Sequence, residues 1–245
     1  MSPRITIAVT LRILRQLHHD RRTIAMLLFV PTILLALLYW VFEGNEKVFD
    51  SIGGPMLGIF PFVTMFLVTS IATLRERTNG TLERLMAMPT HKLDILFGYA
   101  IAFSLIAVLQ VGIASFVASY WLDLDITGSL SWLFVVALVD AWLGIALGLF
   151  VSAFARTEFQ AVQFMPVVVL PQFLLCGLLA PRDQMNEVLY RISDFLPLSY
   201  AIDAVKHITV SSDIDETFIR NILIVVGFSI VVLILGAMTL RRRTD

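Results

Sequence analysis

Charged residues are scarce in this chain of 245 residues. Asp, Glu, Lys and Arg make up only 15% of the sequence and hydrophobic residues 58%, whereas about a quarter of the residues in soluble domains are charged. The apolar residues also come in long unbroken runs rather than in alternating or helically periodic patches. A water-soluble fold cannot bury that much apolar surface, so the composition indicates an integral membrane protein.

The residue patterns of common catalytic and metal sites are also missing. The single cysteine, Cys176, excludes a disulfide within the chain, and we interpret it as a small core residue. The four histidines lack the His-Glu-x-x-His spacing, and no Gly-x-Ser-x-Gly or Gly-x-x-x-x-Gly-Lys-[Ser/Thr] sequence occurs. We therefore expect no catalytic residue, metal or cofactor on this chain. The basic residues are scattered in short segments, so nucleic acid is not an expected partner.

Six apolar runs are long enough to cross a membrane, which predicts an all-α membrane protein. About 30 Å of hydrocarbon requires roughly 20 helical residues, and an even number of spans places both ends of the chain on one side. We expect one membrane domain over residues 1–245. Its predicted spans lie near residues 24–42, 55–74, 95–121, 132–154, 160–180 and 219–240.

The distribution of Lys and Arg among the connecting segments predicts the orientation. Thirteen lie on the side of the N-terminus, among them Arg241, Arg242 and Arg243, and five lie on the other side. Cytoplasmic loops carry the excess of positive charge. We therefore predict that both termini are cytoplasmic, in a cell membrane of bacterial type, and that the loop with Asp123 and Asp125 is external.

Residues 4–19 predict an amphipathic helix before the first span. At 100° per residue, Ile7, Leu11 and Leu14 share one face with Val9, Ile13 and Leu17, and a polar face with Arg4, Arg12 and Arg15 lies opposite. Such a helix lies in the headgroup layer and contacts membrane lipids. A helix packed against a partner protein is the alternative.

The segment between the fifth and sixth spans predicts two short outer helices. Met185, Val188, Leu189, Ile192 and Leu196 form one apolar stripe, and Pro197 is expected to end that helix. Ser199 would cap a second helix that reaches about Ile208. Neither helix is long enough to cross, so we expect a re-entrant or surface segment in which Leu189, Ile192, Pro197 and Tyr200 are the candidate functional residues.

The loop between the second and third spans carries the most informative sequence, from Leu74 to Pro89. Gly80 breaks the second span, Thr81 can cap a new short helix, and Pro89 prevents its continuation. The expected result is a short charged helix that faces the cytoplasm.

This loop resembles that of the permease subunits of type 2 ATP-binding-cassette (ABC) exporters, including the daunorubicin-resistance and polysaccharide or lipid export branches. Their first cytoplasmic loop carries an E-R-x-x-G-T-x-E-x-L pattern, which Glu76, Arg77, Gly80, Thr81, Glu83 and Leu85 match. The sequences at 171–181 and 195–206 are similar to the family's fifth span end and outer re-entrant segment.

The resemblance implies a dimer of permease subunits, identical or paralogous, with two cytoplasmic ATPases that bind ATP and magnesium on separate chains. It also implies that the short helix contacts the ATPase, with Leu82 and Leu85 filling a pocket on it. The expected coupling residues are Arg75, Glu76, Arg77, Gly80, Thr81, Leu82, Glu83, Arg84 and Leu85.

Polar residues within the predicted spans are candidates for the translocation path. Asp140 lies near the middle of the fourth span, where a carboxylate is costly. It either lines the path or forms structural hydrogen bonds, with Gln110 or Gln172 as possible partners. Gly144, Gly148 and Ser152 form a stripe of small residues that predicts close packing with another helix.

These patterns favour an ATP-driven exporter of a hydrophobic or amphiphilic compound, such as a drug, antibiotic or lipid-like molecule. A lipid-linked polysaccharide or glycolipid exporter of the same architecture is the alternative. From another class, a proton-coupled secondary transporter would use Asp140 as its titrating group.

The orientation can be tested by cysteine labelling in intact cells after Cys176 has been replaced by Ala. A cysteine at Ser2 or Thr244 should be protected from an impermeant thiol reagent, and one at Asp125 should react, because positive charge holds the termini inside. Labelling at Ser2 without labelling at Asp125 would reverse the orientation.

Overall fold

The computed structural model describes residues 2–87 and 91–239, without the side chains of Glu83 and Met86, and within that part the chain is helical with no strand. Its elements are α1 Pro3–His19, α2 Arg21–Val41, α3 Glu46–Thr78, α4 Thr81–Ala87, α5 Lys92–Tyr120, α6 Leu130–Ser152, α7 Glu158–Leu175, the 3-10 turn η1 Arg182–Gln184, α8 Glu187–Ser193, α9 Pro197–Val210 and α10 Glu216–Thr239.

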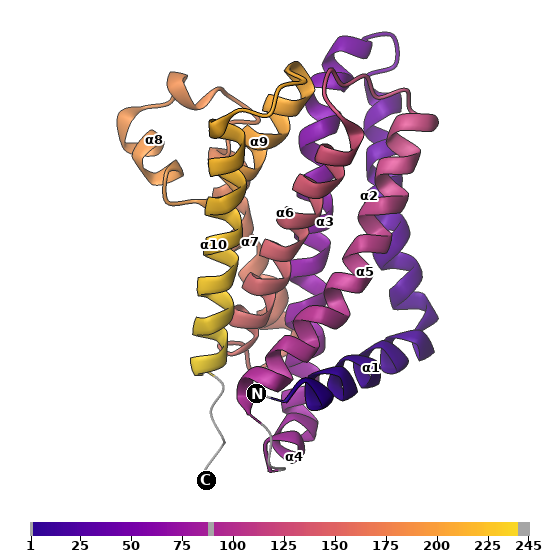
Figure 1. Ribbon diagram of the computed structural model, residues 1–245, viewed down its shortest axis with the longest axis vertical. Helices are drawn as coiled ribbons and strands as arrows, with labels where there is room; N and C mark the ends of the chain where they lie inside the picture. The colour runs from indigo at the N-terminus through magenta and orange to yellow at the C-terminus, as the bar shows by residue number, and fades with distance from the viewer. Residues whose placement is uncertain (1, 88–90, 240–245) are drawn as a thin grey trace.

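Six of these helices are long and apolar enough to cross a membrane, in agreement with the predicted number. They are α2, α3, α5, α6, α7 and α10, and they run along the long axis of the molecule (Figure 1). Helices α1 and α4 lie at the lower end, where α10 also finishes, and α8 and α9 lie at the upper end. The N-terminal helix and the end of α10 therefore share one side, and which side faces the cytoplasm stays a prediction.

Two helix ends differ from the predicted span boundaries by more than four residues. The second span was expected to begin at Pro55, but α3 begins at Glu46, because Gly44, with φ of +84°, and Asn45 end the preceding turn. Phe49 then packs edge to face on Tyr39 at 5.2 Å and buries the first turns. The fifth span was expected to reach residue 180, but α7 ends at Leu175, followed by Gly177 with φ of +86°.

The tightest contact in the core joins α3 and α6 through glycines. A Cβ atom on Gly148 would lie 2.6 Å from the carbonyl oxygen of Phe66, and one on Gly144 would collide with the carbonyl oxygen of Phe62. The predicted stripe of small residues on α6 is confirmed, and α3 is the helix that packs against it. The same face of α6 brings Asp140 against Gly58 of α3.

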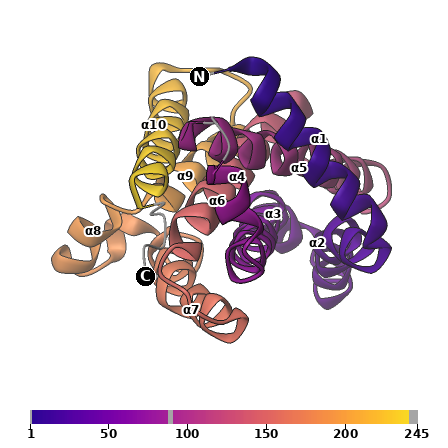
Figure 2. The same cartoon turned by 90° about the horizontal axis from the view of Figure 1, so that it is seen from below.

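Helix α1 lies across the lower end of the bundle and packs on α5 (Figures 1 and 2). The contact is close because a Cβ atom on Gly98 would lie 2.6 Å from Cγ1 of Val9. Asp94, which is fully buried, accepts a hydrogen bond from the backbone N–H of Ser2 at 3.0 Å. The predicted apolar face is thus divided, since Val9 and Ile13 pack inward and Ile7 and Leu11 stay exposed.

The outer segment differs from its predicted form. Helix α8 stands out to one side of the bundle with Leu189 and Ile192 exposed, and it covers only part of the predicted stripe (Figure 1). Pro197 does not simply end a helix; it is the first residue of α9, for which its fixed φ is suitable. Ser199 is therefore buried inside α9 and is not its cap. Helix α9 packs on α3, α6 and α10.

Replacing Gly148 by Ala should destabilise the protein, because the added methyl group meets the backbone of α3. We expect the melting temperature in detergent to fall by roughly 3 to 10 °C. The matched control is Gly227→Ala on α10, where nothing lies within 4 Å of the added Cβ. The control should leave the melting temperature unchanged or raise it slightly. Equal melting temperatures for the two variants would contradict the packing described.

Candidate functional site

The sharp break between α3 and α4 positions the candidate site at the lower end of the molecule. Gly80 has φ of +70°, a conformation that residues with a Cβ rarely adopt. Its backbone N–H donates to the carbonyl oxygen of Arg77, and its own carbonyl oxygen accepts from the N–H of Arg84, both at 3.2 Å. The predicted short helix is confirmed as α4, which starts at Thr81. Its expected stop at Pro89 lies outside the described residues.

The apolar side of α4 faces its own chain rather than a partner. Leu82 is only 2% exposed, and Leu85 packs against the core of the bundle. Leu82 is therefore not available to a pocket on an ATPase in this conformation, and the contact expected of Leu85, which is partly exposed, stays a prediction. Among the described side chains of α4, Arg84 and Ala87 are exposed. The side chain of Glu83 lies outside the description.

Three consecutive residues at the end of α3 reach three other helices. Successive side chains on an α-helix diverge by about 100°, so Arg75, Glu76 and Arg77 must point in different directions. We call these three residues the α3 hub. The hub lies two residues before the break at Gly80, separated from it by Thr78 and Asn79, so it connects α4 with the rest of the bundle.

The first hub residue, Arg75, forms a bidentate ion pair with Glu158 at the start of α7. Its Nε and Nη2 atoms lie 2.6 and 3.0 Å from the two carboxylate oxygens. Both side chains are about half exposed, so the pair contributes at most about 1 kcal/mol to stability. Its planar geometry nevertheless fixes the direction of the contact.

The second hub residue, Glu76, is buried and forms an ion pair with Arg12 of α1. Its side chain is 6% exposed, that of Arg12 is 30% exposed, and the Tyr99 ring from α5 lies beside them. Glu76 therefore does not offer a surface contact in this conformation. Arg12, which the helical pattern placed on a solvated polar face, points into the bundle instead.

The third hub residue, Arg77, donates a hydrogen bond to the carbonyl oxygen of Ser152. Ser152 is the last residue of α6, where backbone carbonyls lack helical partners and the helix dipole favours a cation. The hub therefore connects α3 to the first turn of α7, the middle of α1 and the last turn of α6.

The three path candidates lie inside the bundle of the single chain. Gln110 donates to the carbonyl oxygen of Leu27 at 2.6 Å and to the hydroxyl of Thr64 at 2.7 Å, which links α5 to α2 and α3. Gln172 donates to the carbonyl oxygen of Val168 in its own helix. Neither glutamine is bonded to Asp140, whose carboxylate oxygens have no hydrogen-bond partner among the described residues. A role for these residues in the path stays a prediction.

Comparison with known proteins identifies the family. Residues 5–210 match the ABC-2 type transporter family. This chain belongs to that family. The match covers the α3 hub, α4 and the outer helix α9, and with the six apolar helices it makes the chain a multi-pass membrane protein.

Several named relatives of this ABC-2 chain are ABC transporters and permeases. "Probable multidrug ABC transporter permease YbhS" of Escherichia coli is 23% identical over 89% of the chain and 58% of its own length. "Linearmycin resistance permease protein LnrN" of Bacillus subtilis is 27% identical over 60% of the chain and 38% of its own length. "ABC transporter G family member 20" of Dictyostelium discoideum is 26% identical over 67% of the chain and 22% of its own length. The chain thus spans only part of these relatives.

Arg12→Met should destabilise the protein, because it leaves the Glu76 carboxylate buried without a partner. Since Arg12 is partly exposed, we expect the free energy of unfolding to fall by about 1 to 3 kcal/mol. This is less than the roughly 3 to 5 kcal/mol typically lost when one partner of a fully buried pair is removed. Adding Glu76→Gln should restore much of the loss, as measured by thermal unfolding in detergent. The control Arg15→Met, on the exposed side of α1, should have little effect, and equal losses for Arg12 and Arg15 would contradict the buried ion pair.

Proposed function

We propose that this chain is the membrane subunit of an ATP-driven exporter, coupled through α4 and the α3 hub to a separate cytoplasmic ATPase. The family match supports the transporter class, and permeases of this family typically work with an ATPase subunit. The observation that carries the coupling proposal is that Arg75, Glu76 and Arg77 join the residues next to α4 to α7, α1 and α6.

The geometry favours two different roles among the predicted coupling residues. Some would contact the ATPase, and others would transmit movement inside the permease. Arg84 is the exposed cation on α4 and would meet the ATPase, whereas Leu82 attaches α4 to the bundle. Glu76 is buried and would act inside the permease by carrying a shift of α4 to α1. ATP and magnesium would be bound by the ATPase, whose closure would displace α4.

For the cargo, we propose a hydrophobic or amphiphilic compound. The name of one relative contains "multidrug" and that of another contains "linearmycin resistance". The spans of this chain also contain few charged residues. Inside one chain the polar candidates Gln110, Asp140 and Gln172 are at most 4% exposed. A path would therefore form between two permease subunits, identical or paralogous, or open when the helices move.

Removing the charges of α4 with Glu83→Ala and Arg84→Ala should uncouple the transporter. Arg84 is exposed, and an exposed charge contributes little to folding, but an interface charge that loses its partner can cost about 2 to 5 kcal/mol of binding. We expect normal insertion and melting temperature, with loss of ATPase co-purification or of export.

The matched control is Glu187→Ala with Arg191→Ala, an exposed pair on α8 at the opposite end of the molecule with an N–O distance of 3.3 Å. This control should retain the ATPase. If the α4 variant exports at the original rate with its ATPase bound, α4 is not the coupling element. If no ATPase co-purifies with the unmodified chain, the proposed energy source is wrong and a proton-coupled mechanism has to be considered.

A further inference from the structure

A hollow of about 670 Å³ lies at the upper end of the molecule, between α8, α9 and the first turns of α10. This volume is within the range of pockets that bind small organic molecules. The hollow lies far from the α3 hub, at the opposite end of the bundle (Figure 1). It contains charged, aromatic and amide side chains, and neither the family match nor the proposed coupling assigns it a role.

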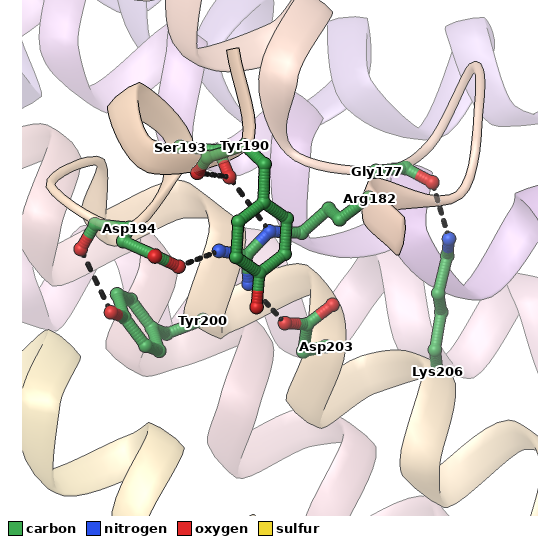
Figure 3. A network of polar contacts seen from close by, with 8 residues as sticks. All are labelled: Gly177, Arg182, Tyr190, Ser193, Asp194, Tyr200, Asp203 and Lys206. Atoms are coloured by element: carbon green, nitrogen blue, oxygen red, sulfur yellow. Dashed lines mark hydrogen bonds and ion pairs between the residues drawn. The ribbon is translucent and has the colours of Figure 1, made fainter. Parts of the chain in front are cut away.

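One wall of the hollow is formed around Arg182, the first residue of η1, which follows Pro181. Its side chain is surrounded by hydrogen-bond acceptors and two aromatic rings (Figure 3). Its Nε donates to the hydroxyl of Ser193 at 2.9 Å, Nη1 to Oδ2 of Asp203 at 2.7 Å and Nη2 to Oδ1 of Asp194 at 2.5 Å. The rings of Tyr190 and Tyr200 lie 5.4 and 5.7 Å from its guanidinium carbon. Arg182 is thus a structural cation that orients two carboxylates.

Each of these carboxylates keeps one oxygen available to the hollow. Asp194 uses Oδ1 and Asp203 uses Oδ2 for Arg182, and their side chains are 39% and 35% exposed. Burial raises the pKa of Asp203, and the ion pair with Arg182 opposes that rise. Oδ2 of Asp194 and Oδ1 of Asp203 are not used by Arg182 and lie on opposite sides of its guanidinium (Figure 3). Either carboxylate can therefore accept a hydrogen bond from a cationic donor in the hollow.

The opposite wall, formed by α10, offers groups for an anion. Arg220 is exposed and forms no ion pair or hydrogen bond with the described residues. Asn221 lines the same hollow and is only 5% exposed, yet its amide also has no hydrogen bond to the described residues. The side-chain amide of Asn221 therefore has its hydrogen-bonding groups available to a polar ligand in the hollow.

The charges of the hollow favour a ligand with both signs of charge and no net charge. Arg182 and Arg220 balance Asp194 and Asp203, so a net anion would face the two carboxylates and a net cation would face Arg220. Phe218 and Ile224 add an apolar side. Next to them along α10, Ile219 and Leu223 are exposed, at 48% and 63%.

We propose that the hollow binds the zwitterionic headgroup of a membrane phospholipid with a primary ammonium group. The phosphate is held by Arg220 and Asn221, and the ammonium by the free oxygen of Asp194 or that of Asp203. The acyl chains follow the exposed apolar residues of α10. A membrane lipid is favoured as the source because Arg220 and Asn221 lie in the first two turns of a span that is only 28% buried, where headgroups of the surrounding leaflet reach directly.

The structure also predicts an order of preference among lipids. A primary ammonium donates hydrogen bonds to carboxylates, whereas the trimethylated ammonium of phosphatidylcholine has no N–H to donate. Phosphatidylglycerol lacks the cation and brings a net negative charge. Phosphatidylethanolamine should therefore bind more tightly than phosphatidylcholine, which should bind more tightly than phosphatidylglycerol.

The test uses the purified full chain, stripped of lipid in detergent and titrated with each of the three phospholipids, with bound lipid counted by native mass spectrometry. Arg220→Gln should weaken phosphatidylethanolamine binding by about tenfold, because a charge-assisted bond to phosphate is lost. Asn221→Leu, which fills the polar end of the hollow, provides a second variant. The control Arg191→Gln changes an exposed arginine on α8 that does not line the hollow.

Equal binding of the three lipids, or unchanged phosphatidylethanolamine binding in both Arg220→Gln and Asn221→Leu, would overturn the proposal. Displacement of phosphatidylethanolamine by an exported amphiphile in an Arg220-dependent manner would also overturn it, because it would assign the hollow to cargo. The proposal does not depend on the ATPase, so it can fail or succeed independently of the proposed function.

Discussion

The divergence of three neighbouring side chains at the end of α3 determines how the lower half of the molecule is held together. Arg75, Glu76 and Arg77 each reach a different helix. Without these contacts α1 would be attached mainly through its packing on α5, and the first turn of α7 would lose its ion pair. Because only Thr78 and Asn79 separate the hub from Gly80, the proposed movement of α4 would act on this junction first.

The middle of α3 is held rigidly against α6. Gly144 and Gly148 let α6 approach the backbone of α3 so closely that neither helix can slide without disturbing the other. The end of α6 is then fixed again through the contact between Ser152 and Arg77. Helices α3 and α6 therefore form a stiff central pair, and α1 and α7 are attached to it at the lower end by ion pairs that can be broken and remade.

Local sequence patterns predicted the local features well and the tertiary contacts poorly. The lengths of the apolar runs predicted the six spans, and the four-residue spacing of small residues predicted the stripe at Gly144 and Gly148. Leu82 of α4 was expected to contact a partner but lies against its own chain, because periodicity shows that a face is buried but not what covers it. The pair of Arg12 and Glu76 joins residues 64 positions apart, and no local signal marks such a pair. Pro197 was interpreted as a stop although the same φ restriction also suits a first helical residue.

The central claim is that the α3 hub carries movement of α4 to α1 and α7. Spin labels on cysteines at Leu11 of α1 and Phe159 of α7, both exposed, would report the distance between these helices in a complex with the proposed ATPase. The account predicts that the distance changes when ATP is trapped, and that Arg75→Gln with Glu76→Gln abolishes this change while the ATPase still binds. The same distance change with and without the hub side chains would contradict the account.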